Sequence, residues 1–422
     1  MPLTQHLRRE IWLMRDRRSN RIYPESGVYM WPNERLINLF GIELPIIQAP
    51  MAGSAFSEMV VAVSEAGGLG SLACAQLTVE QAGRELESIR RRTSRPINVN
   101  FFCHQRPRSE PGREINWRRR LAAYYIQMGL DQNAAVLSSN RTPFDDKMCD
   151  LVLEFQPEVV SFHFGLPDRN LLAHVRRTGA KIISSATSVD EALWLEDQGC
   201  DAIVAQGYEA GGHRGMFLTP DIYTQVGTMA LVPQVVDAVK VPVIAAGGIA
   251  DARGIVAAFA LGAAAVQIGT AYLHCPEAQI SPIYRQALKD VKDNETAITN
   301  VFTGRPARGI VNRLMREVGP MTDVAPEFPL AAAALAPLRS KSEMAGSADF
   351  TPLWSGQAPR LNRELPAAEL TRQLAEETLE KLRFIETMAS PDVLAQAAAL
   401  ATAGRPLSGW PPVASTGRVG RA

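Results

Sequence analysis

The chain has 422 residues, enough for one large domain and a smaller one. Lys and Arg together number 44, as do Asp and Glu, so the balanced charge argues against nucleic acid or an acidic membrane surface as a partner. Hydrophobic residues make up 46% of the chain, which is typical of globular α/β enzymes, and no apolar run is long enough for a transmembrane helix.

We expect five parts along the chain. Residues 1–29 are rich in arginine but lack the features of a secretory signal, so they predict a flexible N-terminal extension. The other four are a barrel domain (30–274), a smaller helical or lid domain (275–362), C-terminal helices that return to the barrel (363–403) and a flexible tail (404–422). Within the lid domain, TGRPARGIVNRLMRE (303–317) predicts a basic loop leading into a helix.

Eight short apolar runs lie between residues 45 and 273, and most are followed by a helical pattern. The predicted strands are 45–49, 69–74, 97–102, 159–164, 181–185, 201–206, 241–246 and 264–268. The predicted helices between them include 56–66, 79–92, 117–128, 145–155, 188–198 and 229–239. This alternation indicates a parallel sheet. The number of strands favours an α/β fold of the (β/α)8 TIM-barrel type, with a second, smaller, mainly helical domain inserted near the C-terminus. An open doubly wound sheet is the alternative, but no GxGxxG follows the first strand.

Glycine turns follow the seventh and eighth predicted strands, at Gly247-Gly248 and Gly269-Thr270. Backbone N–H groups at these turns, together with the N-terminus of a helix that begins near Asp251, can bind an anion. The corresponding loops of (β/α)8 barrels commonly hold phosphate. The turns carry no Lys or Arg, so we expect backbone amides to bind most of a phosphorylated ligand.

Two histidines stand at predicted strand ends. QGYEAGGHRG (206–215) presents His213 behind two glycines, and a histidine at a barrel mouth suits a general base. His163 lies in the aromatic run SFHFG, where a hydrogen-bonded core histidine and a catalytic one are both compatible with the sequence. We expect the remaining histidines singled out, His104, His174 and His274, to be structural or exposed.

Neutral polar side chains also collect at the strand ends: Asn100, Ser185, Gln206, Gln267 and Thr270. Such donors and acceptors suit the edge of a flat heteroaromatic ring better than a sugar polyphosphate. No cluster of His, Asp and Glu has metal-ligand spacing, so we expect no metal. The five cysteines are widely spaced without a CxxC pair, which indicates buried thiols in the cytoplasm.

Five separated segments, in order along the chain, resemble the nitronate monooxygenases, formerly called 2-nitropropane dioxygenases. They are GIELPIIQAPMAG (41–53), VSEAGGLGSL (63–72), INVNFF (97–102), QGYEAGGHRG (206–215) and GGIADARG with AVQIGTAYL (247–273). The PMAG and SFHFGLP segments look most like the class that oxidises propionate 3-nitronate.

The resemblance implies an FMN enzyme without a nicotinamide requirement. It would convert alkyl nitronates, with neutral nitroalkanes as further substrates, with O2 to carbonyl compounds and nitrite or nitrate. His213 matches the catalytic histidine, and the implied FMN contacts are Asn100, Gln206, Gly211, Gly248, Gln267, Ile268, Gly269 and Thr270. Met51, His163 and Ser185 are further candidates to contact substrate or support the site. The partners implied are a small-molecule nitronate and O2, with a monomer or homodimer. The roles of His163, Arg308 and Gln357 stay open.

Three alternatives remain at this stage. Enoyl-thioester and quinone reductases of the same flavin-barrel lineage share GG…QIGT-like turns and use NAD(P)H. A flavin-binding protein without turnover, or a flavin-free barrel acting on a sugar phosphate, would share the fold but not the reaction.

Overall fold

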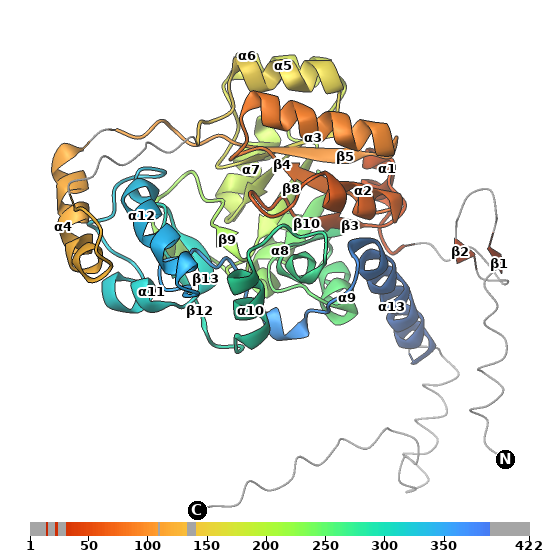
Figure 1. Cartoon of the computed structure of the whole chain (residues 1–422). Coiled ribbons are helices and arrows are strands. Elements are labelled where there is room, and N and C mark those ends of the chain that lie inside the picture. Colours follow the sequence, from red (N-terminus) through yellow and green to blue (C-terminus); the bar gives the residue numbers. More distant parts are fainter. Residues whose placement is uncertain (1–13, 16–21, 24–30, 109, 133–140, 389–422) are drawn as a thin grey trace, which may run out of the picture.

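The computed structural model describes residues 14–15, 22–23, 31–108, 110–132 and 141–388 (Figure 1). Near the N-terminus, β1 (Met14–Arg15) pairs antiparallel with β2 (Ile22–Tyr23). The rest of the predicted N-terminal extension, the predicted tail and everything beyond residue 388 lie outside the described residues. None of the helices in the described ranges is long and apolar enough to cross a membrane.

Eight parallel strands form one sheet, and their positions confirm the predicted ones. They are β3 (Ile46–Gln48), β4 (Gly70–Ala73), β5 (Ile97–Phe102), β6 (Val159–His163), β7 (Lys181–Ala186), β8 (Ala202–Gln206), β10 (Val243–Ala246) and β11 (Ala265–Ile268). The strand order is β3-β11-β10-β8-β7-β6-β5-β4. A parallel bridge between Ile47 and Leu69 joins the two edges. The sheet therefore closes into the predicted TIM barrel.

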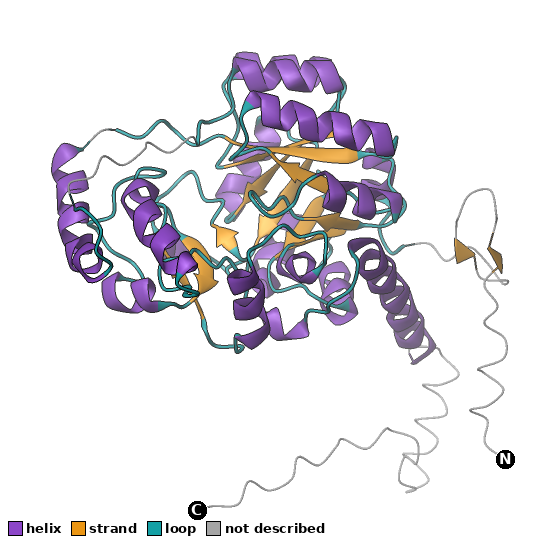
Figure 2. Ribbon diagram, viewed as in Figure 1, coloured by secondary structure: helices purple, strands orange, loops and turns teal. Residues whose placement is uncertain are grey.

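Helices surround this barrel (Figure 2). They are α2 (Ser57–Glu65), α3 (Val79–Arg92), α5 (Asp146–Phe155), α6 (Arg169–Arg177), α7 (Val189–Asp197), α8 (Thr228–Ala238), α9 (Ala252–Ala260) and α13 (Ala367–Met388). Helix α13 packs against both α2 and α9. The hydroxyl groups of Thr371 on α13 and Tyr272 lie 2.8 Å apart. The last described helix thus covers the barrel wall between its first and last helices.

The local sequence accounts for where the barrel helices begin. Ser188 precedes α7, and its hydroxyl accepts a hydrogen bond from the backbone N–H of Glu191. Asp145 caps α5 in the same way. Helix α1 (Arg35–Phe40) buries Leu36 and Phe40 in a cluster with residues of the barrel strands.

A second lobe lies beside the barrel (Figure 1). It contains α4 (Pro111–Gln127), α10 (Pro282–Asp290), α11 (Arg313–Val318), α12 (Ala331–Met344), β9 (Gly212–His213), β12 (Thr296–Thr299) and β13 (Ala307–Ile310). Three short 3₁₀ helices are η1 (Ile222–Thr224), η2 (Thr270–His274) and η3 (Pro359–Leu361). The lobe has a core of its own, in which Trp117 of α4 donates to the carbonyl of Ala331 at 3.1 Å. Helix α4 begins six residues before the predicted start, with a proline in its first turn.

One prediction for the lobe is wrong in part. The segment 303–317 leads into a helix as predicted, α11, but Ala307–Ile310 form strand β13 instead of a loop. This strand pairs antiparallel with β12 on one side and with β9 on the other. All four of its residues are buried, Arg308 included. A four-residue strand with a buried arginine has no alternating apolar pattern, which is why the sequence did not predict it.

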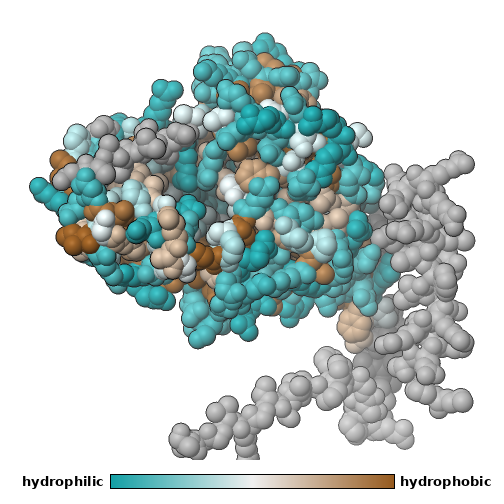
Figure 3. Space-filling model, in the orientation of Figure 1, coloured by the Kyte–Doolittle hydropathy of each residue, from teal (hydrophilic) through white to brown (hydrophobic). Residues whose placement is uncertain are grey.

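The hydropathy of the surface differs between the barrel and the lobe. On the face in Figure 3, hydrophilic side chains cover most of the barrel helices, and apolar ones gather over the lobe. Exposed apolar residues of the lobe include Ile115 and Ile126 on α4 and Met344 on α12.

Candidate active site

A large cavity opens at the carboxyl ends of the barrel strands. Its empty space, counted out to the open mouth, is about 1370 Å³. Both the barrel and the lobe line it: Asn100 and Gln206 come from strands, and Tyr284 and Trp354 come from the chain after the barrel. In (β/α)8 barrels this end of the sheet carries the active site.

The fold brings nearly all of the predicted site residues together around this cavity. Its lining includes Met51, Asn100, His163, Ser185, Gln206, Gly211, His213, Gly248, Gln267, Gly269 and Thr270. Ile268 is the exception, because its side chain is fully buried in the barrel core. Its backbone carbonyl accepts a hydrogen bond from Ala49 at 2.8 Å.

His213 lies where the barrel meets the lobe. It belongs to β9, the short strand that pairs with Ala307 of β13. Its Nε2 lies 2.9 Å from the hydroxyl oxygen of Thr303. Four aromatic rings surround the imidazole, with centroids between 5.3 and 6.2 Å away: Phe102, Phe164, Phe328 and Trp354.

The environment of His213 keeps its imidazole neutral. Burial lowers its pKa well below the ordinary value, and the positive charges of Arg141 and Arg305 lower it further. The Thr303 hydroxyl also lies 3.4 Å from the carbonyl of Arg305. When the hydroxyl donates to that carbonyl, it accepts from Nε2 of His213, which puts the proton on Nε2 and the lone pair on Nδ1. A half-buried neutral imidazole of this kind can accept a proton from a bound molecule.

His163 holds the backbone of His213. Its Nε2 lies 3.2 Å from the His213 carbonyl, and because a carbonyl only accepts, Nε2 carries the proton. Nδ1 then accepts from the Ser185 hydroxyl at 3.1 Å. Burial and the charge of Arg305 lower the pKa of His163 to about 3. Both ring nitrogens are thus occupied, and His163 acts as a positioning residue although it also lines the cavity.

Gln206 reinforces the same loop. Its amide donates to the His213 carbonyl at 3.0 Å and accepts from the backbone N–H of Gly215 at 2.7 Å. Arg308 and Gln357, whose roles the sequence left open, connect lobe and barrel. Arg308 donates to the carbonyl of Tyr208 at 3.0 Å, and the backbone N–H of Gln357 donates to the carbonyl of Glu209 at 3.0 Å.

The glycine turns also line the cavity. Gly247 and Gly248 have φ values of 117° and 70°, which only glycine adopts readily. A Cβ on Gly211 would lie 2.5 Å from the backbone nitrogen of Gly356. The hydroxyl of Thr270 accepts a hydrogen bond from that same Gly356 N–H at 3.0 Å. The segment around Gly356 therefore closes directly over the second turn.

The N-terminus of α9 was predicted to help bind an anion, but its backbone amides are already hydrogen-bonded within the protein. The carboxylate of Asp251 accepts hydrogen bonds from the N–H groups of Arg253 and Gly254, at 2.9 and 3.4 Å. These amides are therefore occupied by a capping side chain with a negative charge of its own. The backbone of the glycine turns is the part left to bind an anion.

Sequence reasoning missed several residues of this site. Thr303, Arg305 and Trp354 contact His213 or influence it electrostatically, and Arg141 and Asn362 line the cavity. All of them lie outside the barrel strands. Thr303 and Arg305 lie in the basic segment 303–317, and Trp354 is an aromatic residue with a glycine two positions later, but neither pattern predicted a contact with His213.

Comparison with known proteins gives a consistent result. The family model for nitronate monooxygenase matches residues 33–377. A nitronate monooxygenase from Pseudomonas aeruginosa is 40% identical over 346 residues, covering 82% of this chain and 99% of that protein. One from Paraburkholderia phytofirmans is 41% identical over 355 residues, covering 82% and 96%. The solved structure of a nitroalkane oxidase from Streptomyces ansochromogenes is 38% identical with a TM-score of 0.75, covering 83% of this chain and 99% of that one.

Proposed function

Because this chain belongs to the nitronate monooxygenase family of oxidoreductases, we propose that it uses FMN and O2 to oxidise alkyl nitronates such as propionate 3-nitronate. The products are carbonyl compounds together with nitrite or nitrate, and neutral nitroalkanes are further substrates. The observation that carries this proposal is the neutral, half-buried His213 in the wall of a cavity that the glycine turns also line.

The chemistry of the cavity fits FMN. Turns without side chains let backbone N–H groups approach a phosphate closely. The positive φ values of Gly247 and Gly248 belong to such a turn. Amide side chains of Asn100, Gln206 and Gln267 can meet the polar edge of a flat ring. Bound FMN accepts the electrons of the substrate, while the protein binds, orients and excludes water.

His213 has a different task with each form of substrate. From a neutral nitroalkane, Nδ1 removes the proton on the carbon that bears the nitro group. A nitronate has already lost this proton, and its negative charge is attracted by the nearby cations Arg141 and Arg305. The same two charges that keep His213 neutral thus favour an anion in the cavity.

The visible spectrum of the purified protein, followed by anaerobic titration, tests the proposal. We expect a flavin spectrum that propionate 3-nitronate bleaches and NADH does not. Rapid bleaching by NADH would instead support a reductase of the same lineage. A flavin spectrum that neither compound changes would indicate a flavin-binding protein without turnover, and a colourless protein would point to a sugar phosphate enzyme.

A further inference from the structure

Asn362 has a side-chain amide that the rest of the described protein does not satisfy. Both its Nδ2 and its Oδ1 are buried, and neither has a hydrogen-bond partner among the described residues. The residue lines the cavity. Burying an amide without partners is unfavourable, so such a group at a cavity wall points to a ligand that supplies them.

Asn362 lies in the part of the chain that covers the second glycine turn. It follows η3, in the segment that crosses the second glycine turn through the contact between Gly356 and Thr270. Gly356 and Ala358 of this segment line the cavity with it. The segment begins at the aromatic wall around His213, to which Trp354 belongs. We place the reacting end of a bound molecule at that wall and its opposite end at the turns and residues 356–362.

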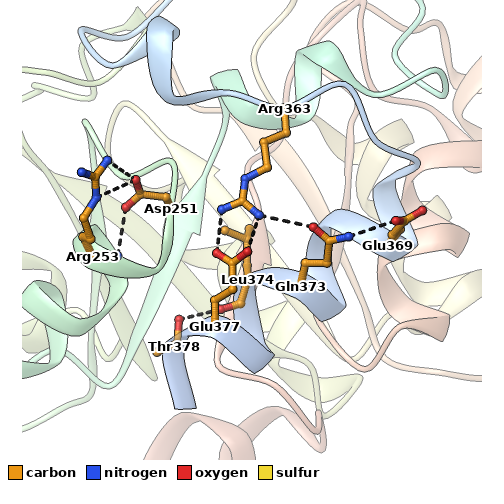
Figure 4. Close-up of polar contacts among 8 residues, drawn as sticks. All are labelled: Asp251, Arg253, Arg363, Glu369, Gln373, Leu374, Glu377 and Thr378. Atoms are coloured by element: carbon orange, nitrogen blue, oxygen red, sulfur yellow. Dashed lines mark hydrogen bonds and ion pairs between the residues drawn. The ribbon is translucent and has the colours of Figure 1, made fainter. Parts of the chain in front are cut away.

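The charged groups next to Asn362 are already paired. Arg363 forms an ion pair with Glu377 of α13 at 2.6 Å, and Arg253 forms one with Asp251 at the start of α9 (Figure 4). Figure 4 shows the Arg363 guanidinium directed at α13. Arg363 and Asp251 are close enough to influence each other electrostatically, which places the start of α13 beside the turn that leads into α9. The amide of Asn362 is therefore a side-chain donor without a partner at this end of the cavity, beside the Thr270 hydroxyl, which accepts from Gly356 and keeps its own proton to donate.

We propose that the Nδ2 group of Asn362 donates a hydrogen bond to the phosphate of bound FMN. The inference rests on the proposed function, since it requires that the cofactor be FMN. The phosphate is then held from two directions: by the backbone of the glycine turns of the barrel, and by a side chain from the segment that leads into α13.

The affinities of the apoprotein for FMN and for riboflavin, which lacks the phosphate, test this inference by flavin fluorescence. A hydrogen bond to a charged group contributes enough that N362A should lower FMN affinity by about tenfold or more. N362D should lower it further, because it places a carboxylate beside the phosphate. Riboflavin affinity should be unchanged in both variants, which also shows that they are folded. L361A, at the exposed neighbouring residue, is the matched control and should bind FMN as the unaltered protein does.

Two results would overturn the inference. Unchanged FMN affinity in N362A and N362D would show that the amide contacts nothing on the cofactor. Equal losses for FMN and riboflavin would place any contact away from the phosphate. Both results differ from failure of the proposed function itself, in which the unaltered protein would not bind FMN. If N362A does not fold, the isosteric N362D provides the same comparison.

Discussion

Thr303 Oγ1 lies 2.9 Å from Nε2 of His213, although 90 residues separate the two in the chain. His213 follows a barrel strand, and Thr303 follows β12 of the lobe. The contact therefore joins the two parts of the molecule at the side chain proposed to react, and its direction sets which ring nitrogen carries the proton.

Replacing Thr303 by valine tests this contact. T303V keeps the shape of the side chain but removes the acceptor, so the imidazole loses its fixed orientation. A neutral hydrogen bond is worth about 1 kcal/mol, and we expect kcat/KM for a nitroalkane to fall by roughly fivefold. T303S retains the hydroxyl and should keep most of the activity. Equal activity of T303V and the unaltered protein would show that Thr303 does not orient the base.

Replacing His213 by asparagine separates its two roles. H213N removes the base, and general-base catalysis typically contributes about 10²–10⁴-fold, so turnover of neutral nitroalkanes should fall by that factor. Turnover of the matching preformed nitronate should persist in part, because its proton is already gone. Steady-state rates with both forms of one substrate provide the measurement. Equal losses on the two forms would remove the base role from His213.

The charge of Arg305 should set the acid limit of activity. His213 acts as a base only when neutral, and its lowered pKa places the loss of nitroalkane activity well below pH 6.5. R305M removes a cation, so protonation of His213 becomes easier and its pKa rises. The acid limb of kcat/KM should therefore move to higher pH.

R305K is the matched control for this shift. It keeps the positive charge near Phe164, over whose ring the Arg305 guanidinium lies at 3.9 Å, so its acid limb should stay near that of the unaltered protein. An unmoved limb in R305M would mean that Arg305 does not control His213 electrostatically.

Gly207 allows no side chain. A Cβ there would lie 1.9 Å from the hydroxyl oxygen of Thr228 and 2.5 Å from its backbone nitrogen. We expect G207A to lower the free energy of unfolding by at least about 1–3 kcal/mol, because the start of α8 must move. G83A in α3 would meet only Leu151 at 3.7 Å and should stabilise the protein by about 0.5–1 kcal/mol. Urea denaturation compares the two; a stable G207A would show that this turn adapts.

The sequence by itself determined the barrel and the barrel side of the cavity. A strand such as β10 is buried on both faces, so it appears as a continuous apolar run bounded by glycine, and this pattern is local. Parallel strands in a barrel end on the same side. Polar residues at strand ends, such as Asn100 and Gln206, therefore had to meet around one opening.

Only the tertiary structure decided which residues of the lobe face the polar residues at the strand ends. Strand β13 is four residues long, and its pairing with β9 depends on closure of the lobe onto the barrel. The predicted roles of three residues depend on the tertiary structure: Thr303, Arg305 and Asn362. Thr303 and Arg305 act on His213, which is distant in the chain, and Asn362 lines the cavity. The periodicity of apolar residues predicts helices and strands but not contacts between residues that are distant in the chain. The neutral state of His213 arises in the same way, because burial and neighbouring charges, rather than residue type, set its pKa.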